Sequence, residues 1–95
     1  MSSIRLVFRV HAIRRMFQRR ISTEEVKQVI ATGEAIEAYP NDKPFPSRLI
    51  LGWSGDRPLH VVVADDSQAQ ETIIVTVYQP NVEEWEQGFK RRKPR

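Results

Sequence analysis

One stretch constrains the fold of this chain more than any other, the run RPLHVVVA from Arg57 to Ala64. It is rich in β-branched residues and is bounded by turn residues on both sides, a pattern typical of a buried β-strand. Because successive side chains of a strand point to opposite faces, His60 must lie on the face opposite Leu59 and Val61. A core strand therefore carries a titratable group on its second face.

The flanking segments predict an α+β fold built on an antiparallel sheet of about four strands. The expected strands are Glu34–Tyr39, Ser47–Trp53, Arg57–Ala64 and Glu71–Tyr78. Ser54, Gly55 and Asp56 form a tight turn between the second and third of them, which indicates a β-hairpin. Residues 4–10 alternate weakly and fit either a short edge strand or the start of a helix.

Helical periodicity predicts two N-terminal helices and one C-terminal helix around this sheet. The first runs from Val10 to Arg20, with an apolar stripe of Ala12, Ile13, Met16 and Phe17. The second begins with a capping box at Ser22 and Glu25 and ends at Gly33, where we expect a C′ glycine. Pro80 turns the chain into the last helix, in which Val82, Trp85 and Phe89 recur at helical spacing.

Strand alternation also predicts what the two faces of the sheet carry. The face toward the helices would consist of Leu49, Leu51, Trp53, Leu59, Val61, Val63, Ile73, Val75 and Val77. The opposite face would then display Arg48, His60, Thr76 and Tyr78. We therefore expect an arginine, a histidine and a tyrosine to meet on a shallow, semi-apolar surface across three adjacent strands.

Length and composition limit the possible classes of protein. A chain of 95 residues suits a single domain, residues 1–95, with a disordered basic tail from about residue 90. With no cysteine, two histidines and no glycine-rich phosphate loop in the sequence, we expect neither a metal nor a cofactor. No apolar run is long enough to span a bilayer and no signal peptide is recognisable, so we expect a cytoplasmic protein without a membrane partner.

The placement of charge is more informative than its sum of +3. Basic residues occupy both ends of the chain, whereas the acidic residues lie between Glu24 and Glu86. Arginine outnumbers lysine eleven to four, and its planar guanidinium suits phosphate, which favours RNA as a partner. Solvated termini that only keep the protein soluble explain the same pattern equally well.

The residues of the second face match what metal-independent RNA cleavage requires, namely a base, an acid and cations that hold phosphate. The candidate catalytic residues are His11, His60 and Tyr78, and the candidate phosphate-binding residues are Arg15, Arg19 and Arg48. Each also has a structural interpretation. The histidines fit a hydrogen-bonded core residue and a helix cap, the arginines fit solvated ion pairs, and the tyrosine fits a hydroxyl bonded to backbone.

Several groups of residues carry a resemblance to a known family. They are His11-Ala12, Arg15-Met16, Tyr39-Pro40, Pro46-Ser47-Arg48-Leu49, the strand Arg57–Val62, and Thr76-Val77-Tyr78. From Ile4 to Phe89 the chain resembles the small bacterial family catalogued as domain of unknown function 4258. Members of that family resemble RelE/ParE- and MqsR-like toxins of type II toxin–antitoxin systems. The resemblance implies a RelE-like fold and a cognate antitoxin, such as a YgiT-type zinc-finger protein, that masks the toxin.

Together these features predict a toxin that acts as a metal-independent endoribonuclease of the mRNA interferase type, with His60 or His11 moving protons. One alternative is a non-catalytic small basic module that binds nucleic acid or a protein partner through the same face. Another is a ParE-like gyrase poison, because a fold alone does not fix function. The sequence leaves open a homodimer, the RNA preference and which histidine is the base.

Overall fold

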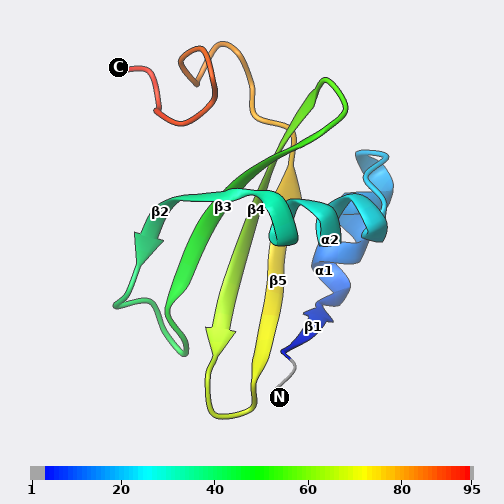
Figure 1. The fold of residues 1–95 in the computed structure, drawn as a ribbon, viewed down its shortest axis with the longest axis vertical. Coiled ribbons are helices and arrows are strands. Elements are labelled where there is room, and N and C mark those ends of the chain that lie inside the picture. Colours follow the sequence, from blue (N-terminus) through cyan, green and yellow to red (C-terminus); the bar gives the residue numbers. More distant parts are fainter. Residues whose placement is uncertain (1–3, 95) are drawn as a thin grey trace.

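The run from Arg57 to Ala64 becomes β4 (Arg57–Asp66), the central strand of a five-stranded mixed sheet (Figure 1). The computed structural model describes residues 4–94. The other elements are β1 (Arg5–Phe8), α1 (Val10–Gln18), α2 (Thr23–Thr32), β2 (Glu34–Tyr39), β3 (Ser47–Ser54) and β5 (Glu71–Tyr78). The strands follow the order β1-β5-β4-β3-β2 across the sheet, and all neighbours are antiparallel except β1 and β5.

The expected sheet of about four antiparallel strands is therefore wrong, because residues 5–8 add a fifth, parallel strand. β1 pairs with the first half of β5, from Arg5 opposite Glu71 to Phe8 opposite Ile74. Leu6 and Phe8 pack against the hydrophobic core from this position. Their burial favours the strand over an early start of the first helix.

The expected C-terminal helix is also wrong, since residues 80–94 form turns and bends. Trp85 is buried, whereas Val82 is 65% exposed, so the two residues do not share a buried helix face. Gly88 and Phe89 adopt φ angles of 91° and 62°, and a helix cannot continue through the left-handed region. The chain instead folds back, and Trp85 forms an isolated antiparallel bridge with Arg92.

A two-residue turn decides which residues of β3 and β4 share a face. Ser54 pairs with Arg57, and Gly55 takes a φ of 62° between them. This register places Ile50 opposite Val61, and Ile50 joins the hydrophobic core on the α2 side of the sheet. The prediction that Leu49, Leu51 and Trp53 face the helices is therefore wrong. Leu49 and Leu51 are buried on the second face, and Trp53 is 45% exposed.

A β-bulge changes the alternation of β5 in the same way. Val62 pairs with Thr76 but Val63 pairs with Ile74, so Val75 is the extra residue. Ile74 and Val77 consequently enter the core, and Val75 stays 39% exposed. The expected alternation of Ile73, Val75 and Val77 on the helix-facing side is therefore correct only for Val77.

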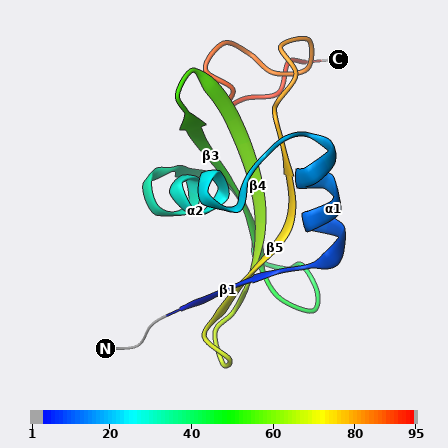
Figure 2. The same ribbon diagram turned by 90° about the vertical axis from the view of Figure 1, so that its right-hand side faces the viewer.

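The two helices cover different parts of the sheet. The capping box of α2 is confirmed, because the Ser22 hydroxyl accepts from the Glu25 N–H at 3.1 Å and the Glu25 carboxylate accepts from the Ser22 N–H at 2.9 Å. α2 packs on β3 and β4, whereas α1 contacts β5. Figure 2 shows the two helices on either side of the β4 and β5 ribbons. Where β1 does not reach, Arg19 at the end of α1 donates to the Val77 carbonyl at 2.6 Å.

Candidate functional site

His60 and Tyr78 meet on the second face of the sheet. They are register partners on β4 and β5, and the Tyr78 hydroxyl oxygen lies 3.3 Å from His60 Nδ1. The two rings pack edge to face, with their centroids 5.3 Å apart. The prediction that these two residues share a face is therefore confirmed, but the expected shallow surface is wrong for His60, which is completely buried.

Residues 80–94, which we name the C-terminal segment, close over the imidazole. His60 is 0% exposed, and its Nε2 lies 2.9 Å from the Phe89 carbonyl oxygen. The Trp85 ring packs edge-on against the imidazole at a centroid distance of 4.4 Å. Because a carbonyl can only accept, Nε2 must carry the hydrogen and Nδ1 is left to accept from the Tyr78 hydroxyl. His60 therefore reaches any ligand only through Tyr78.

Tyr78 is the half-buried member of the pair, and charged side chains surround it. Burial is the largest cause of the raised pKa of its phenol, because it disfavours the phenolate. The positive charges of Arg92 and Arg19 lower this pKa, whereas the negative charges of Glu37 and Glu84 raise it further. Charges of both signs therefore act on the hydroxyl that His60 accepts from.

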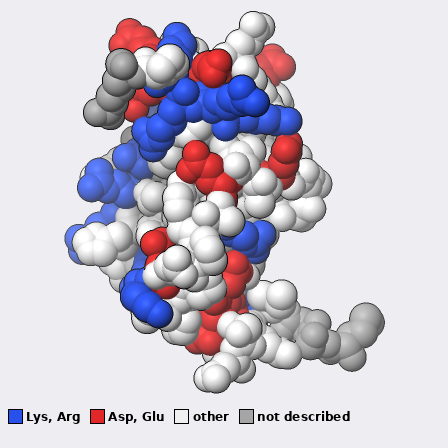
Figure 3. All heavy atoms as spheres, turned by 90° about the vertical axis from the view of Figure 1, so that its left-hand side faces the viewer, with Lys and Arg blue, Asp and Glu red and all other residues white. Residues whose placement is uncertain are grey.

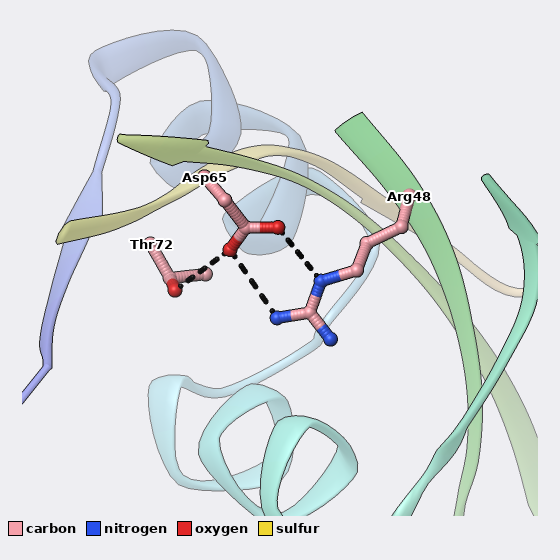
Figure 4. Close-up of polar contacts among 3 residues, drawn as sticks. All are labelled: Arg48, Asp65 and Thr72. Carbon is pink, nitrogen blue, oxygen red and sulfur yellow. Dashed lines mark hydrogen bonds and ion pairs between the residues drawn. The ribbon is translucent and has the colours of Figure 1, made fainter. Parts of the chain in front are cut away.

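Arg48 does not belong to this group of residues. It is the register partner of Val63, so its side chain projects toward α2, on the face opposite His60. Its Nε lies 2.9 Å from one Asp65 carboxylate oxygen and its Nη2 lies 3.3 Å from the other, while Thr72 donates to the same carboxylate (Figure 4). The prediction that Arg48 shares a face with His60 and Tyr78 is therefore wrong.

We expect the Arg48→Gln variant to behave almost like the wild type. Arg48 and Asp65 are each 36% exposed, and solvent-exposed ion pairs contribute about 0–1 kcal/mol. Urea unfolding should therefore show a decrease of at most about 1 kcal/mol in unfolding free energy. Any RNA cleavage should be unchanged, because the guanidinium lies on the wrong face. A strong loss of cleavage in a stably folded Arg48→Gln variant would contradict this placement.

The other candidates lie along one side of α1. His11 and Arg15 are exposed one turn apart, and Arg19 follows one turn later. At a rise of about 1.5 Å per residue, His11 and Arg19 are separated by about 12 Å along the helix axis. The structure thus brings Arg19 to the end of β5 that carries Tyr78, and it leaves His11 near the start of α1.

Residues 8–79 match the family described as Domain of unknown function (DUF4258), which is more than half of the chain. The chain belongs to the DUF4258 family. No curated protein and no solved structure matches it. The family prediction is confirmed, and the likeness to RelE- and ParE-type toxins stays a prediction.

The DUF4258 match includes His60 and Tyr78 but ends before the C-terminal segment that covers them. The expected helix contained Trp85 and Phe89, and the expected disordered tail contained Arg92, which in the structure stacks over the Trp85 ring at 4.9 Å. Gly88 was the available signal, because a glycine in the middle of an expected helix marks a turn.

Figure 3 shows Lys and Arg side chains in a band across the upper part of the β2 side. Lys90 is paired there with Glu34 at 2.9 Å.

A second tyrosine on this side of the DUF4258 domain, Tyr39, is bonded to an acid rather than to a histidine. The Tyr39 hydroxyl donates to the Glu37 carboxylate within β2, and this bond raises the pKa of Tyr39 to about 12. Tyr39 is 38% exposed and therefore offers a comparison for Tyr78.

Within residues 4–94 no three His, Asp or Glu side chains gather in a way that could hold a metal ion. No helix in that range has the length and apolar character needed to cross a membrane.

We expect the stability of the DUF4258 domain to fall when the pH is lowered below the ordinary His60 pKa of 6.5. Burial lowers the pKa of His60 in the folded state, although the bond to the Phe89 carbonyl opposes this shift. Between the folded and ordinary pKa values the unfolded chain therefore binds one more proton than the folded chain. Stability is then full above pH 6.5 and falls by up to about 1.4 kcal/mol per pH unit below it.

Urea unfolding at a series of pH values measures this effect. The His60→Phe variant should lose the dependence near pH 6.5, since it has no titrating group in the core. The His11→Gln variant should keep it, because His11 is exposed. Identical pH profiles for the wild type and His60→Phe would contradict the prediction.

Proposed function

We propose that this chain is the toxin component of a toxin–antitoxin pair and that it cleaves RNA without a metal. The observation that supports the proposal most is the hydrogen bond between Tyr78 and His60 beside the charges of Arg19 and Arg92. It joins a half-buried hydroxyl to a neutral imidazole whose tautomer is fixed by the Phe89 carbonyl. The positive charges of Arg92 and Arg19, which lower the pKa of Tyr78, are of the kind that stabilise phosphate.

The reaction we propose is attack of the ribose 2′-hydroxyl on the adjacent phosphate. The Tyr78 oxygen takes the 2′-hydroxyl proton while its own proton passes to His60 Nδ1. The Phe89 carbonyl supports the resulting imidazolium by accepting from Nε2. Burial disfavours this imidazolium, so the proton returns through the Tyr78 oxygen to the 5′-oxygen as the bond between that oxygen and phosphorus breaks.

Arginine side chains supply the electrostatic part of the proposal. The charges of Arg19 and Arg92 act on the phenol and would compensate the charge that develops on the phosphorane, against the opposing charges of Glu37 and Glu84. Arg15, which is exposed one turn before Arg19, would contact a neighbouring phosphate of the RNA backbone. In this proposal the hydroxyl of Tyr78 touches the substrate, and His60 acts through it.

The test is the rate at which purified protein cleaves an end-labelled oligoribonucleotide, with the cyclic phosphate product identified. The Tyr78→Phe variant removes one oxygen atom and should lower the rate by about a hundredfold, the lower range for general acid–base catalysis. Tyr39→Phe removes the equivalent atom from the other tyrosine and should keep the wild-type rate. Equal rates for wild type and Tyr78→Phe would refute the role of the phenol. In cells, induced wild type should arrest growth and Tyr78→Phe should not.

A second candidate function is a non-catalytic module that binds RNA, and the complete burial of His60 favours it. Such a module would bind RNA through arginines, and its affinity would fall steeply with salt. Tyr78→Phe would then bind RNA as the wild type does, and neither protein would cleave it. The same oligoribonucleotide, followed by anisotropy and by gel, separates the two candidates.

A further inference from the structure

The outer side of α1 exposes apolar side chains that no other described element covers. Val10, Ile13 and Phe17 are 65%, 49% and 86% exposed. Their spacing of three and then four residues places them in a row along one side of the helix. We name this row the α1 outer stripe. It is continuous and includes a phenylalanine, unlike the scattered apolar residues normal on a protein surface.

A hollow of ≈ 530 Å³ continues the stripe toward α2. Its lining residues are Met16, Phe17, Arg20, Ile21, Ser22 and Glu25. Glu25 is already engaged there, because it caps α2 through Ser22 and lies 3.9 Å from Arg57. The apolar row thus leads into a concave site at the junction of the two helices.

The charge that borders the stripe itself is positive, and the acid that lines the hollow, Glu25, is already bonded to Ser22 and paired with Arg57. Arg14 lies one turn after Val10 and borders the stripe on its outer side, and Arg20 lines the hollow. The first acidic residue of the whole chain is Glu24. A ligand that covers the stripe would therefore gain from acidic groups beside its apolar ones.

We propose that the α1 outer stripe binds an amphipathic, acidic helix of a protein partner. Leucine-like side chains of that helix would cover Ile13 and Phe17 and enter the hollow, and its carboxylates would pair with Arg14 and Arg20. RNA fits this surface less well, because only Phe17 offers an aromatic face for a base, whereas Val10 and Ile13 are aliphatic. A lipid surface also fits less well, because it has no projecting side chain to fill the hollow.

This inference stands apart from the proposed RNA cleavage. Arg15 and Arg19 lie on the other side of α1, and Arg19 is turned toward β5 by its bond to the Val77 carbonyl. Changes in the stripe should therefore leave cleavage unaffected. If the protein does not cleave RNA, the proposed partner site is unaffected. If the stripe does not bind the peptide, the proposed RNA cleavage is unaffected.

The probe for the test is a fluorescein-labelled peptide of about 15 residues, the length at which an isolated helix becomes marginally stable. Leucines lie along one side of this helix and glutamates occupy the rest, and a second peptide has lysines in place of the glutamates. Fluorescence anisotropy with the full chain should show binding of the glutamate peptide only. Phe17→Ser and Arg14→Glu should each weaken it at least tenfold. Lys27→Glu, the same charge reversal on the exposed side of α2, should not.

Two other probes give the remaining outcomes. If the lysine peptide binds as tightly as the glutamate peptide, or if Phe17→Ser binds normally, the proposed site is wrong. A second contrary result is that the glutamate peptide does not bind, while binding of anionic phosphatidylserine vesicles or of the oligoribonucleotide is lost in Phe17→Ser. In that case the stripe binds lipid or RNA, and the proposal is overturned. Phe17 is almost fully exposed, so Phe17→Ser should melt at the wild-type temperature, which separates lost binding from lost folding.

Discussion

Replacement of His60 by alanine is expected to lower the free energy of unfolding by about 3–5 kcal/mol. His60 is 0% exposed and packs against Trp85, so the change leaves a cavity of the size of an imidazole ring beside Trp85. It also leaves the Phe89 carbonyl and the Tyr78 hydroxyl without the partners that His60 provides. Urea unfolding followed by tryptophan fluorescence measures both consequences, because Trp85 should become exposed as the C-terminal segment detaches.

The His60→Phe variant is the matched control, because it keeps an aromatic ring in the space and removes only the hydrogen bonds. Its loss of unfolding free energy should be smaller than that of His60→Ala, about 1–3 kcal/mol. Wild-type stability in His60→Ala would show that the C-terminal segment does not depend on the imidazole. The expected instability also means that lost activity in His60→Ala cannot identify a catalytic base. Tyr78→Phe, which removes one half-buried oxygen, is the more specific test of the proposed reaction.

Alternation along β4 was sufficient to predict the central pair of this site. Once Leu59 and Val61 are assigned to the core, His60 has to project from the second face, and Tyr78 reaches the same face from β5. Arg48 was assigned to the wrong face because the pairing of β3 with β4 was assumed from hydrophobic residues. The two-residue turn between Ser54 and Arg57 places odd-numbered residues of β3 opposite even-numbered residues of β4. Turn length was thus a better guide than hydrophobicity.

The C-terminal segment could not be predicted in the same way. Val82, Trp85 and Phe89 have helical spacing, but the structure buries Trp85 against His60 and packs the Phe89 ring against Trp53. Phe89 adopts a positive φ, which costs a non-glycine residue free energy that only surrounding contacts can offset. Those contacts come from strands more than twenty residues earlier in the chain, so no local pattern contains them. The parallel pairing of β1 with β5 is a long-range contact of the same kind.

Replacement of Gly33 by alanine is expected to lower the free energy of unfolding by about 3 kcal/mol. Gly33 follows α2 with a φ of −79°, so its role as a left-handed C′ glycine, expected from the sequence, is wrong. The glycine is needed for space. A Cβ at this position would collide with the Val29 carbonyl oxygen and would lie 2.6 Å from the Leu51 carbonyl oxygen and 2.8 Å from an Ile50 methyl group. Backbone atoms on two sides cannot move aside as a side chain can.

Two other glycines give a graded comparison. A Cβ at Gly52 would lie 2.8 Å from both Val29 methyl groups and 3.0 Å from the Val29 Cα, and valine is stiff at χ1, so α2 must give way slightly and Gly52→Ala should lose about 2 kcal/mol. Gly55→Ala meets no atom within 4 Å, and its cost of about 1 kcal/mol comes from the positive φ of the turn. Urea unfolding should therefore rank the losses in the order Gly33, Gly52, Gly55. A loss at Gly33 no greater than that at Gly55 would mean that α2 and β3 can separate easily. The close contact of α2 with β3 would then not be what fixes the sheet on which His60 and Tyr78 meet.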